Sequence, residues 1–203
     1  MKSLSLAFAI FLLVAGAALA QSEKAAVADQ LAAARSELTV LRERYLDSHP
    51  VMAVQLACVA ELERQAAQPV PEPGPLRAAR LQLAVMEVRM GERHPTLRQQ
   101  QARVRALEDV YREFPAARDE LALARSDLAA DELRYGEAHP RLRLQREKVA
   151  TLTRNLTAKS PDSTEVRLAR ANMEILLARY GERNPKVIAA RARLAAIEPA
   201  AAQ

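Results

Sequence analysis

All three histidines of the chain precede a proline and are spaced 45 residues apart, at His49, His94 and His139. Imidazole ligates metal ions and titrates near neutral pH, so a stacked row of histidines would predict a metal or pH-sensing site, with Glu92 and Glu137 as further ligands. Neighbouring helical repeats lie about 10 Å apart, whereas ligands lie about 2 Å from a shared metal ion. We therefore interpret the histidines as turn residues and assign no metal and no cofactor.

Other combinations of reactive residues do not form a recognisable catalytic site. Asp47, Ser48 and His49 have the residue types of a catalytic triad, but adjacency in sequence is not triad geometry, and no other copy keeps the serine. The chain has no glycine-rich phosphate loop and no Cys-x-x-Cys pair. We predict no catalytic residue and no enzymatic activity, with an envelope hydrolase or metal-dependent enzyme as the alternative.

The segment around each histidine is part of a unit that recurs four times at a constant spacing of 45 residues. In the fourth copy an asparagine takes the place of the histidine. The predicted turn residues are Arg44, Tyr45, His49 and Pro50; Arg89, Gly91, His94 and Pro95; Arg134, Tyr135, Gly136, His139 and Pro140; and Arg179, Tyr180, Gly181, Asn184 and Pro185.

Each turn position has a structural explanation. The arginines lie where a cation meets the carboxyl end of a helix, and the prolines suit the first position of the next helix. The glycine column predicts a backbone at positive φ, which glycine adopts without strain. The first copy has Leu46 in this column. A shared turn geometry would cost Leu46 about 1–2 kcal/mol, so Leu46→Gly is expected to raise the melting temperature.

The residues on either side of each turn have helical spacing. Leu31, Leu38 and Tyr45 are seven residues apart before the first turn, and Met52 and Val59 are seven apart after it. Two such narrow apolar seams must pack against each other, because neither buries its apolar face alone. The sequence predicts an all-α fold of four tandem antiparallel helical hairpins, a coiled coil or short α-solenoid, with arms of about 18–22 residues.

The predicted segments follow from the turns and from proline-rich breaks. Regular stacking of the hairpins is one arrangement, and a first hairpin that swings on the proline-rich segment is the alternative. The segments are a signal peptide at 1–20, helical hairpin 1 at 21–68, a linker at 69–75, hairpin 2 at 76–113, hairpin 3 at 114–159, and hairpin 4 at 160–203.

The amino-terminal segment and the composition predict secretion. Lys2 precedes an apolar run, and Ala18-Leu19-Ala20 is a small-x-small cleavage site before Gln21, which is typical of a secretory signal. No second apolar run is long enough to span a membrane. The net charge is +5, but the charges alternate in sign along the chain, which argues against nucleic-acid binding. Aromatic residues make up only 3%, which is unusual for a ligand pocket.

Two further features have a structural and a functional interpretation. Cys58 is the only cysteine, and its counterparts in the other copies are charged. We interpret it as a thiol on a helix flank, with an intermolecular disulfide as the alternative. A column of arginines flanks the seams, and we expect them to pair with neighbouring acids, with an anionic ligand as the alternative. These arginines are Arg35, Arg80, Arg125 and Arg170.

The turn resembles a segment of bacterial polysaccharide co-polymerases, the chain-length determinant and exopolysaccharide-export family. That segment has Arg-Tyr-x-x-x-His-Pro followed by a leucine-rich arm, which here is Arg134-Tyr135 to His139-Pro140 with Leu142 and Leu152. The resemblance implies a periplasmic coiled-coil hairpin with a part in polysaccharide export, although that family has membrane helices and this chain has none. Gly136 to Pro140 also resembles the junctions of tetratricopeptide arrays, which implies an adaptor.

Together these features predict a periplasmic interaction or scaffold protein at the cell envelope. The expected partner is another protein or a second copy of the chain, because exposed seam edges recruit further helices. An acidic envelope glycan is the alternative partner, and its binding would weaken with salt.

Overall fold

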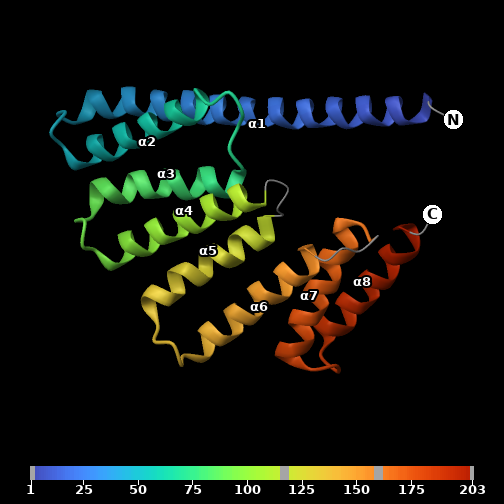
Figure 1. Ribbon diagram of the computed structural model, residues 1–203. Helices are drawn as coiled ribbons and strands as arrows, with labels where there is room; N and C mark the ends of the chain where they lie inside the picture. Colours follow the sequence, from blue (N-terminus) through green and yellow to red (C-terminus); the bar gives the residue numbers. More distant parts are fainter. Residues whose placement is uncertain (1–2, 115–118, 158–161, 202–203) are drawn as a thin grey trace. The chain divides into compact units, whose positions relative to one another are not determined.

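The computed structural model describes residues 3–114, 119–157 and 162–201, which form eight α-helices and no strand (Figure 1). This confirms the all-α prediction of helical hairpins. The helices are α1 (Ser3–Arg44), α2 (Pro50–Ala66), α3 (Gly74–Arg89), α4 (Pro95–Glu113), α5 (Asp119–Arg134), α6 (Pro140–Thr157), α7 (Thr164–Tyr180) and α8 (Pro185–Ala201).

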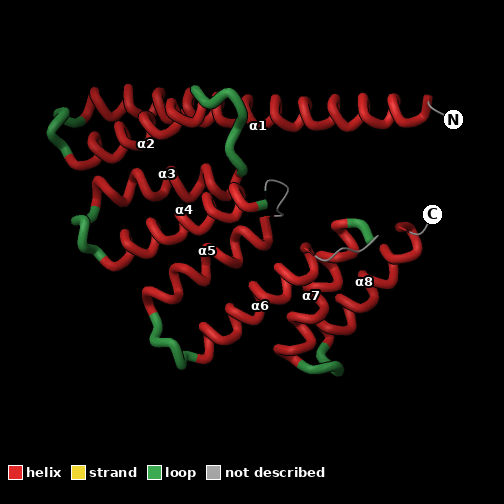
Figure 2. The backbone as a smooth tube through the Cα atoms, in the orientation of Figure 1, coloured by secondary structure: helices red, strands yellow, loops and turns green. Residues whose placement is uncertain are grey.

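The chain divides into two compact units, Met1–Gln100 and Gln101–Gln203, with the boundary inside α4. In the first unit α1 and α2 form a hairpin, and α3 packs against α2. The turns after α1 and after α3 lie at the same end of these helices (Figure 2). In the second unit α5 pairs with α6 and α7 with α8, and α7 also packs against α6.

The seam of the first hairpin forms its core, as its helical spacing predicts. Ala34, Leu38, Met52, Val59 and Leu62 are buried together, and Met52 has no exposed surface. Burial of each large side chain contributes about 1.5–3 kcal/mol to stability. The buried positions at the end of the seam depart from an exact seven-residue repeat. Residues seven apart on an α-helix are offset by about 20° around its axis, and this offset accumulates along the seam. At the end of α2 the buried residue is therefore Gln65, and Ala66 is exposed.

The second unit repeats this packing with other apolar side chains. Leu142, Leu152 and Val187 are fully buried and come from the same alignment columns as Met52 and Leu62 of the first hairpin. Leu121 and Val166 are also buried, in the column of Leu31, which is only partly buried.

The helix boundaries differ slightly from those predicted. Apart from α1, the arms have 16 to 19 residues, and most are shorter than the predicted length of about 18–22 residues. The linker covers residues 67–73, two residues earlier than the predicted 69–75, because α2 ends at Ala66 and α3 begins at Gly74 with a proline in its first turn. At the later junctions Pro115, Ser160 and Pro161 lie outside the described residues.

The first helix includes most of the predicted signal peptide, since α1 is continuous from Ser3 to Arg44. Over the residues that the structure describes, no helix combines the length and the apolar character needed to cross a membrane.

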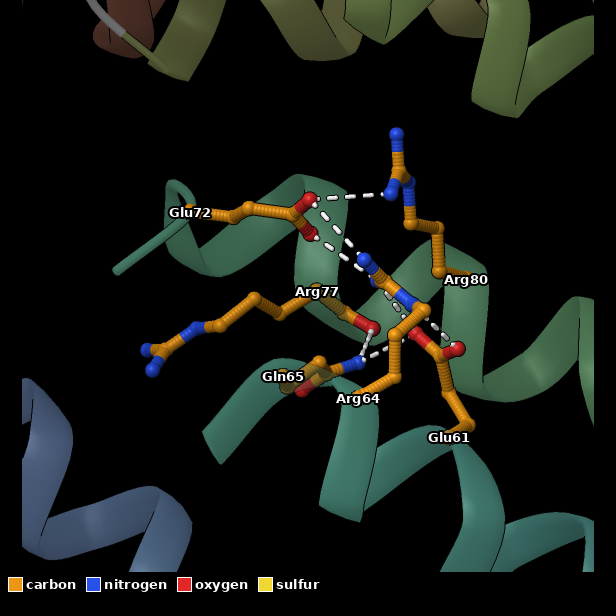
Figure 3. Close-up of polar contacts among 6 residues, drawn as sticks. All are labelled: Glu61, Arg64, Gln65, Glu72, Arg77 and Arg80. Carbon is orange, nitrogen blue, oxygen red and sulfur yellow. Dashed lines mark hydrogen bonds and ion pairs between the residues drawn. The ribbon is translucent and has the colours of Figure 1, made fainter. Parts of the chain in front are cut away.

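The linker between α2 and α3 is held by an ion-pair network (Figure 3). The carboxylate of Glu72 lies 2.8 Å from Arg80 and 3.3 Å from Arg64, and Arg64 lies 2.7 Å from Glu61. Gln65 donates to Glu61 and to the carbonyl oxygen of Arg77 in α3. The side chains of Glu61 and Glu72 are only 11% and 16% exposed, so these contacts fix the junction instead of leaving the first hairpin free to swing.

The network also controls the ionisation of its carboxylate. Burial alone would raise the pKa of Glu61, but hydrogen bonds from Arg64 and Gln65 outweigh it, and the pKa lies below its ordinary value. The hydrogen bond to Glu61 likewise raises the pKa of Arg64. Both groups therefore remain charged at neutral pH and keep α2, the linker and α3 together.

Candidate functional site

The four hairpin turns share one backbone hydrogen bond, from the residue before the proline to the carbonyl three residues earlier. Each bond closes a tight turn that reverses the chain between two helices. The donor–acceptor distances are 2.9 Å for His49 to Leu46, 2.8 Å for His94 to Gly91, 2.9 Å for His139 to Gly136 and 3.3 Å for Asn184 to Gly181.

The residue before each proline is the N-cap of the following helix. The Nδ1 atoms of His49, His94 and His139 accept a hydrogen bond from the backbone N–H two residues further on, at 3.2–3.3 Å. In the fourth turn the Oδ1 of Asn184 accepts the same bond at 2.9 Å. Nδ1 of histidine and Oδ1 of asparagine branch from the side chain at the same position. The two residue types therefore replace each other because each offers an acceptor there.

The glycine column was predicted wrongly for two of its three members. Only Gly181 has a positive φ, of 76°, and no other residue of the described chain does. Gly91 follows Met90, which leaves the helix in an extended conformation with φ −125° and ψ 145°. Gly136 likewise lacks a positive φ. In the fourth turn Tyr180 stays helical, so Gly181 must make the reversal itself.

The same observation removes the strain expected at Leu46. This residue is not at positive φ, and its side chain is 80% exposed. The reason for expecting a gain in stability from Leu46→Gly is therefore lost.

Aromatic and cationic side chains cover the outside of the turns. The ring of Tyr45 stacks on His49 with centroids 4.3 Å apart, and Tyr135 stacks on His139 at 4.2 Å. In the fourth turn, the Cζ atom of Arg179 lies 5.2 Å from the centroid of the Tyr180 ring, and the Nζ atom of Lys186 lies 5.3 Å from it. These contacts hold the aromatic and capping side chains in place, which is a structural use of the repeated Arg-Tyr pair.

The histidines show no arrangement for metal binding. Each Nδ1 atom is already engaged by a backbone N–H. Across the described ranges, no group of three or more His, Cys, Asp or Glu side chains is placed to hold a metal ion.

The arginine column pairs with carboxylates of the chain itself. The ion pairs span helices or join a helix to the segment before it, so the guanidinium groups are engaged without an external anion. The distances are 2.7 Å for Arg35–Glu63, 2.8 Å for Arg80–Glu72, 2.8 Å for Arg125–Glu113, 2.8 Å for Arg170–Asp162 and 2.9 Å for Arg170–Glu198.

The third hairpin has a buried carboxylate where the other hairpins have Leu41, Met86 and Leu176. The side chain of Asp131 is only 9% exposed, and its Oδ2 accepts a hydrogen bond of 2.8 Å from Nε of Arg141. This hydrogen bond raises the pKa of Arg141. The carboxylate is thus neutralised by a side chain that reaches across the turn.

A column of glutamines in the seams, buried at Gln55 and Gln100 and half-buried at Gln145, was missed by the sequence analysis. Gln55, Gln100 and Gln145 each donate from Nε2 to the carbonyl oxygen of the alanine 21 residues earlier, at 2.8–2.9 Å. A helical carbonyl oxygen has a second lone pair for such a bond. The signal in the sequence was an identical polar residue at one seam position in three successive copies.

The fourth hairpin lacks this glutamine and has an open groove at the same place. Ala190 takes the position of the glutamine, and it lines a groove of about 470 Å³ between α7 and α8. Its other lining residues are Leu168, Ala169, Asn172, Leu176 and Ala189, the cations Lys186 and Arg193, and the carboxylates Glu165 of α7 and Glu120 of α5.

Restoring the glutamine should stabilise the last hairpin. In Ala190→Gln the new amide can donate to the Ala169 carbonyl, and we expect a gain of about 1 kcal/mol from the hydrogen bond. Urea denaturation followed by circular dichroism measures the change. Ala195→Gln is the matched control, because Ala195 is exposed and does not line the groove. A midpoint for Ala190→Gln no higher than that of Ala195→Gln would contradict this account of the groove.

Cys58 lies deeper than its charged counterparts suggested. It is partly buried and packs against the core cluster of the first hairpin, as Leu81 of α3 also does. Burial, and then the nearby Glu37, raises the pKa of the thiol. The reactive thiolate is thus disfavoured, which argues against an intermolecular disulfide.

No protein-family model, curated protein or solved structure matches the chain. The function is therefore inferred from the geometry of the hairpins and from the features of the sequence.

Proposed function

We propose that this protein is a non-enzymatic helical-repeat scaffold, secreted to the periplasm, that docks another protein at the cell envelope. The observation that carries the proposal is the surface of the last helix. Val187 and Leu194 of α8 are buried, yet Ile188 on the same helix is 56% exposed. A helix that is apolar on more than one side is ordinarily covered on those sides.

The exposed surface of α8 is more apolar than that of α6. Besides Ile188, it exposes the small apolar residues Ala189, Ala192, Ala195 and Ala196. The exposed positions of α6 are mostly charged and include Arg141, Arg143, Arg146, Glu147 and Arg154. An apolar surface of this kind marks an interaction site.

The cellular location is supported by the amino-terminal sequence. The apolar run and the Ala18-Leu19-Ala20 site favour export, with Gln21 as the first residue after cleavage. The resemblance of the turns to the periplasmic hairpins of polysaccharide co-polymerases supports a part in polysaccharide export.

Site-specific photo-crosslinking in living cells tests the function. A benzoylphenylalanine at Ile188 should give a crosslinked protein product in the envelope fraction. The control is the same probe at Arg143, the counterpart of Ile188 on α6, which is also exposed and should give none. Mass spectrometry of the recovered protein should find Gln21 at its amino terminus. Equal crosslinking at both positions, or a cytoplasmic protein that keeps Met1, would contradict the proposal.

A further inference from the structure

We propose that the protein docked on α8 is a second copy of this chain, which presents its α1 to the groove between α7 and α8. This deepens the proposed function, on which it rests, by naming the partner. The inference follows from the junctions between hairpins, which repeat the same alignment columns.

The first helices of the hairpins share one alignment position that faces the preceding hairpin. In α3, the carbonyl oxygen of Arg77 accepts a hydrogen bond of 3.1 Å from Gln65 of α2. In α7, the counterpart Arg167 donates to the carbonyl oxygen of Leu156 of α6 at 3.0 Å. The corresponding residue of α1 is Ala32, which is exposed.

The face of α1 around Ala32 corresponds to a buried face of α5. In α5, Ala122, Ser126 and Ala130 follow one another at intervals of four residues and are 0%, 3% and 4% exposed. Their counterparts in α1 are Ala32, Ser36 and Val40, all exposed, with Val40 at 44%. The small residues of α1 thus form the kind of face that α5 buries, without a neighbour to cover it.

The groove on the last hairpin corresponds to a site that is filled in the first hairpin. There, Leu81 of α3 and Cys58 of α2 both pack against the cluster that contains Ala34. The counterparts of Ala34 and Cys58 are Ala169 and Arg193, which line the open groove.

The next turn of α8 also has an exposed position where the equivalent turn of α6 has a buried one. Thr151 of α6 is 7% exposed beside α7, whereas its counterpart Ala196 is exposed. On α8 the last hairpin therefore exposes the counterpart of a position that α6 buries.

One pair of charges on the two faces is complementary in this register. Lys148 of α6 and Ala178 of α7 line the same small groove at their junction. The counterpart of Lys148 on α8 is Arg193, and the counterpart of Ala178 on α1 is Glu43, both exposed. Docking in the register of the α6–α7 junction places Arg193 beside Glu43 of the second copy, and opposite charges favour that register.

Such a contact is heterologous, because the two copies contribute different surfaces. Each bound copy leaves a free α8 for the next, so association continues beyond a dimer unless the array closes into a ring. A symmetric contact between two α8 helices would instead stop at a dimer.

The test uses two variants, each of which blocks one surface with an exposed arginine. Ala196→Arg blocks α8 and Ser36→Arg blocks α1; both positions are exposed, so folding should be retained and is checked by circular dichroism. Analytical ultracentrifugation of the purified protein should show a mass that rises with concentration. Each variant alone should be monomeric, and an equimolar mixture should give a dimer and nothing larger, because one free α8 then meets one free α1.

The control is Ala150→Arg, the same change at an exposed alanine of α6, which should associate as the unaltered protein does. A monomeric unaltered protein at every concentration, a dimer formed by Ser36→Arg alone, or a mixture that stays monomeric would each overturn the inference. These outcomes leave the proposed function testable by itself, because a crosslink from Ile188 to a different envelope protein would still support a scaffold.

Discussion

Simultaneous replacement of His49, His94 and His139 by alanine should lower the stability of the protein by about 1 kcal/mol for each N-cap that is lost. Replacement of the same three residues by asparagine should retain the stability, because Asn184 already makes this cap in the fourth turn. Urea denaturation of the two triple variants measures the difference. Similar losses in both variants would show that the imidazole rings act through their stacking and not through Nδ1.

The Glu61 network predicts a loss of stability in acid. The pKa of Glu61 in the folded protein is below its ordinary value. Its contribution to stability is therefore complete above the ordinary carboxyl pKa, about 4.3, and is lost at lower pH. Melting curves recorded above and below this pKa measure the loss.

Replacement of Asp131 by leucine should increase the stability of the third hairpin, by about 1–3 kcal/mol if it behaves as other buried ion pairs do. The substitution restores the residue type of the other copies and removes a carboxylate that is 9% exposed. Thermal denaturation of the single variant gives the effect. A lower melting temperature would mean that the pair with Arg141 more than offsets the cost of burying Asp131.

A double-mutant cycle identifies the cause. Arg141→Ala should destabilise the protein, because it leaves the Asp131 carboxylate buried without its partner. In the Asp131→Leu background the same change should have little effect. Equal effects of Arg141→Ala in both backgrounds would assign the loss to the contact between Arg141 and the Tyr135 ring instead.

The helices and turns could be predicted because they depend on local patterns. The seven-residue spacing of Leu31 and Leu38 and the proline after each turn specify helices and their starts without reference to distant residues. The conformation of Gly91 was not predictable in this way. A helix can end through an extended residue such as Met90 or through a glycine at positive φ such as Gly181, and both endings fit the same turn sequence.

The candidate site was harder to predict because it depends on contacts between segments. The carbonyl acceptors of Gln55 and Gln100 belong to the backbone, which carries no sequence signal. The groove at Ala190 can be predicted from the sequence only after the glutamines at the equivalent positions of the other hairpins have been recognised. The uncovered faces of α1 and α8 likewise follow from the comparison of equivalent positions in the structure, since Ser36 and Ser126 are the same residue type with opposite exposure.

The glutamine contacts align the two arms of a hairpin lengthwise. Sliding one arm by a helical turn, about 5.4 Å, would separate the amide of Gln55 or Gln145 from its carbonyl and leave both groups in an apolar seam. Buried polar pairs of this kind specify one alignment of paired helices. The α7–α8 pair has alanines at both of these positions, so its lengthwise alignment lacks the buried polar contact, and the ion pair between Arg170 and Glu198 joins its two arms instead.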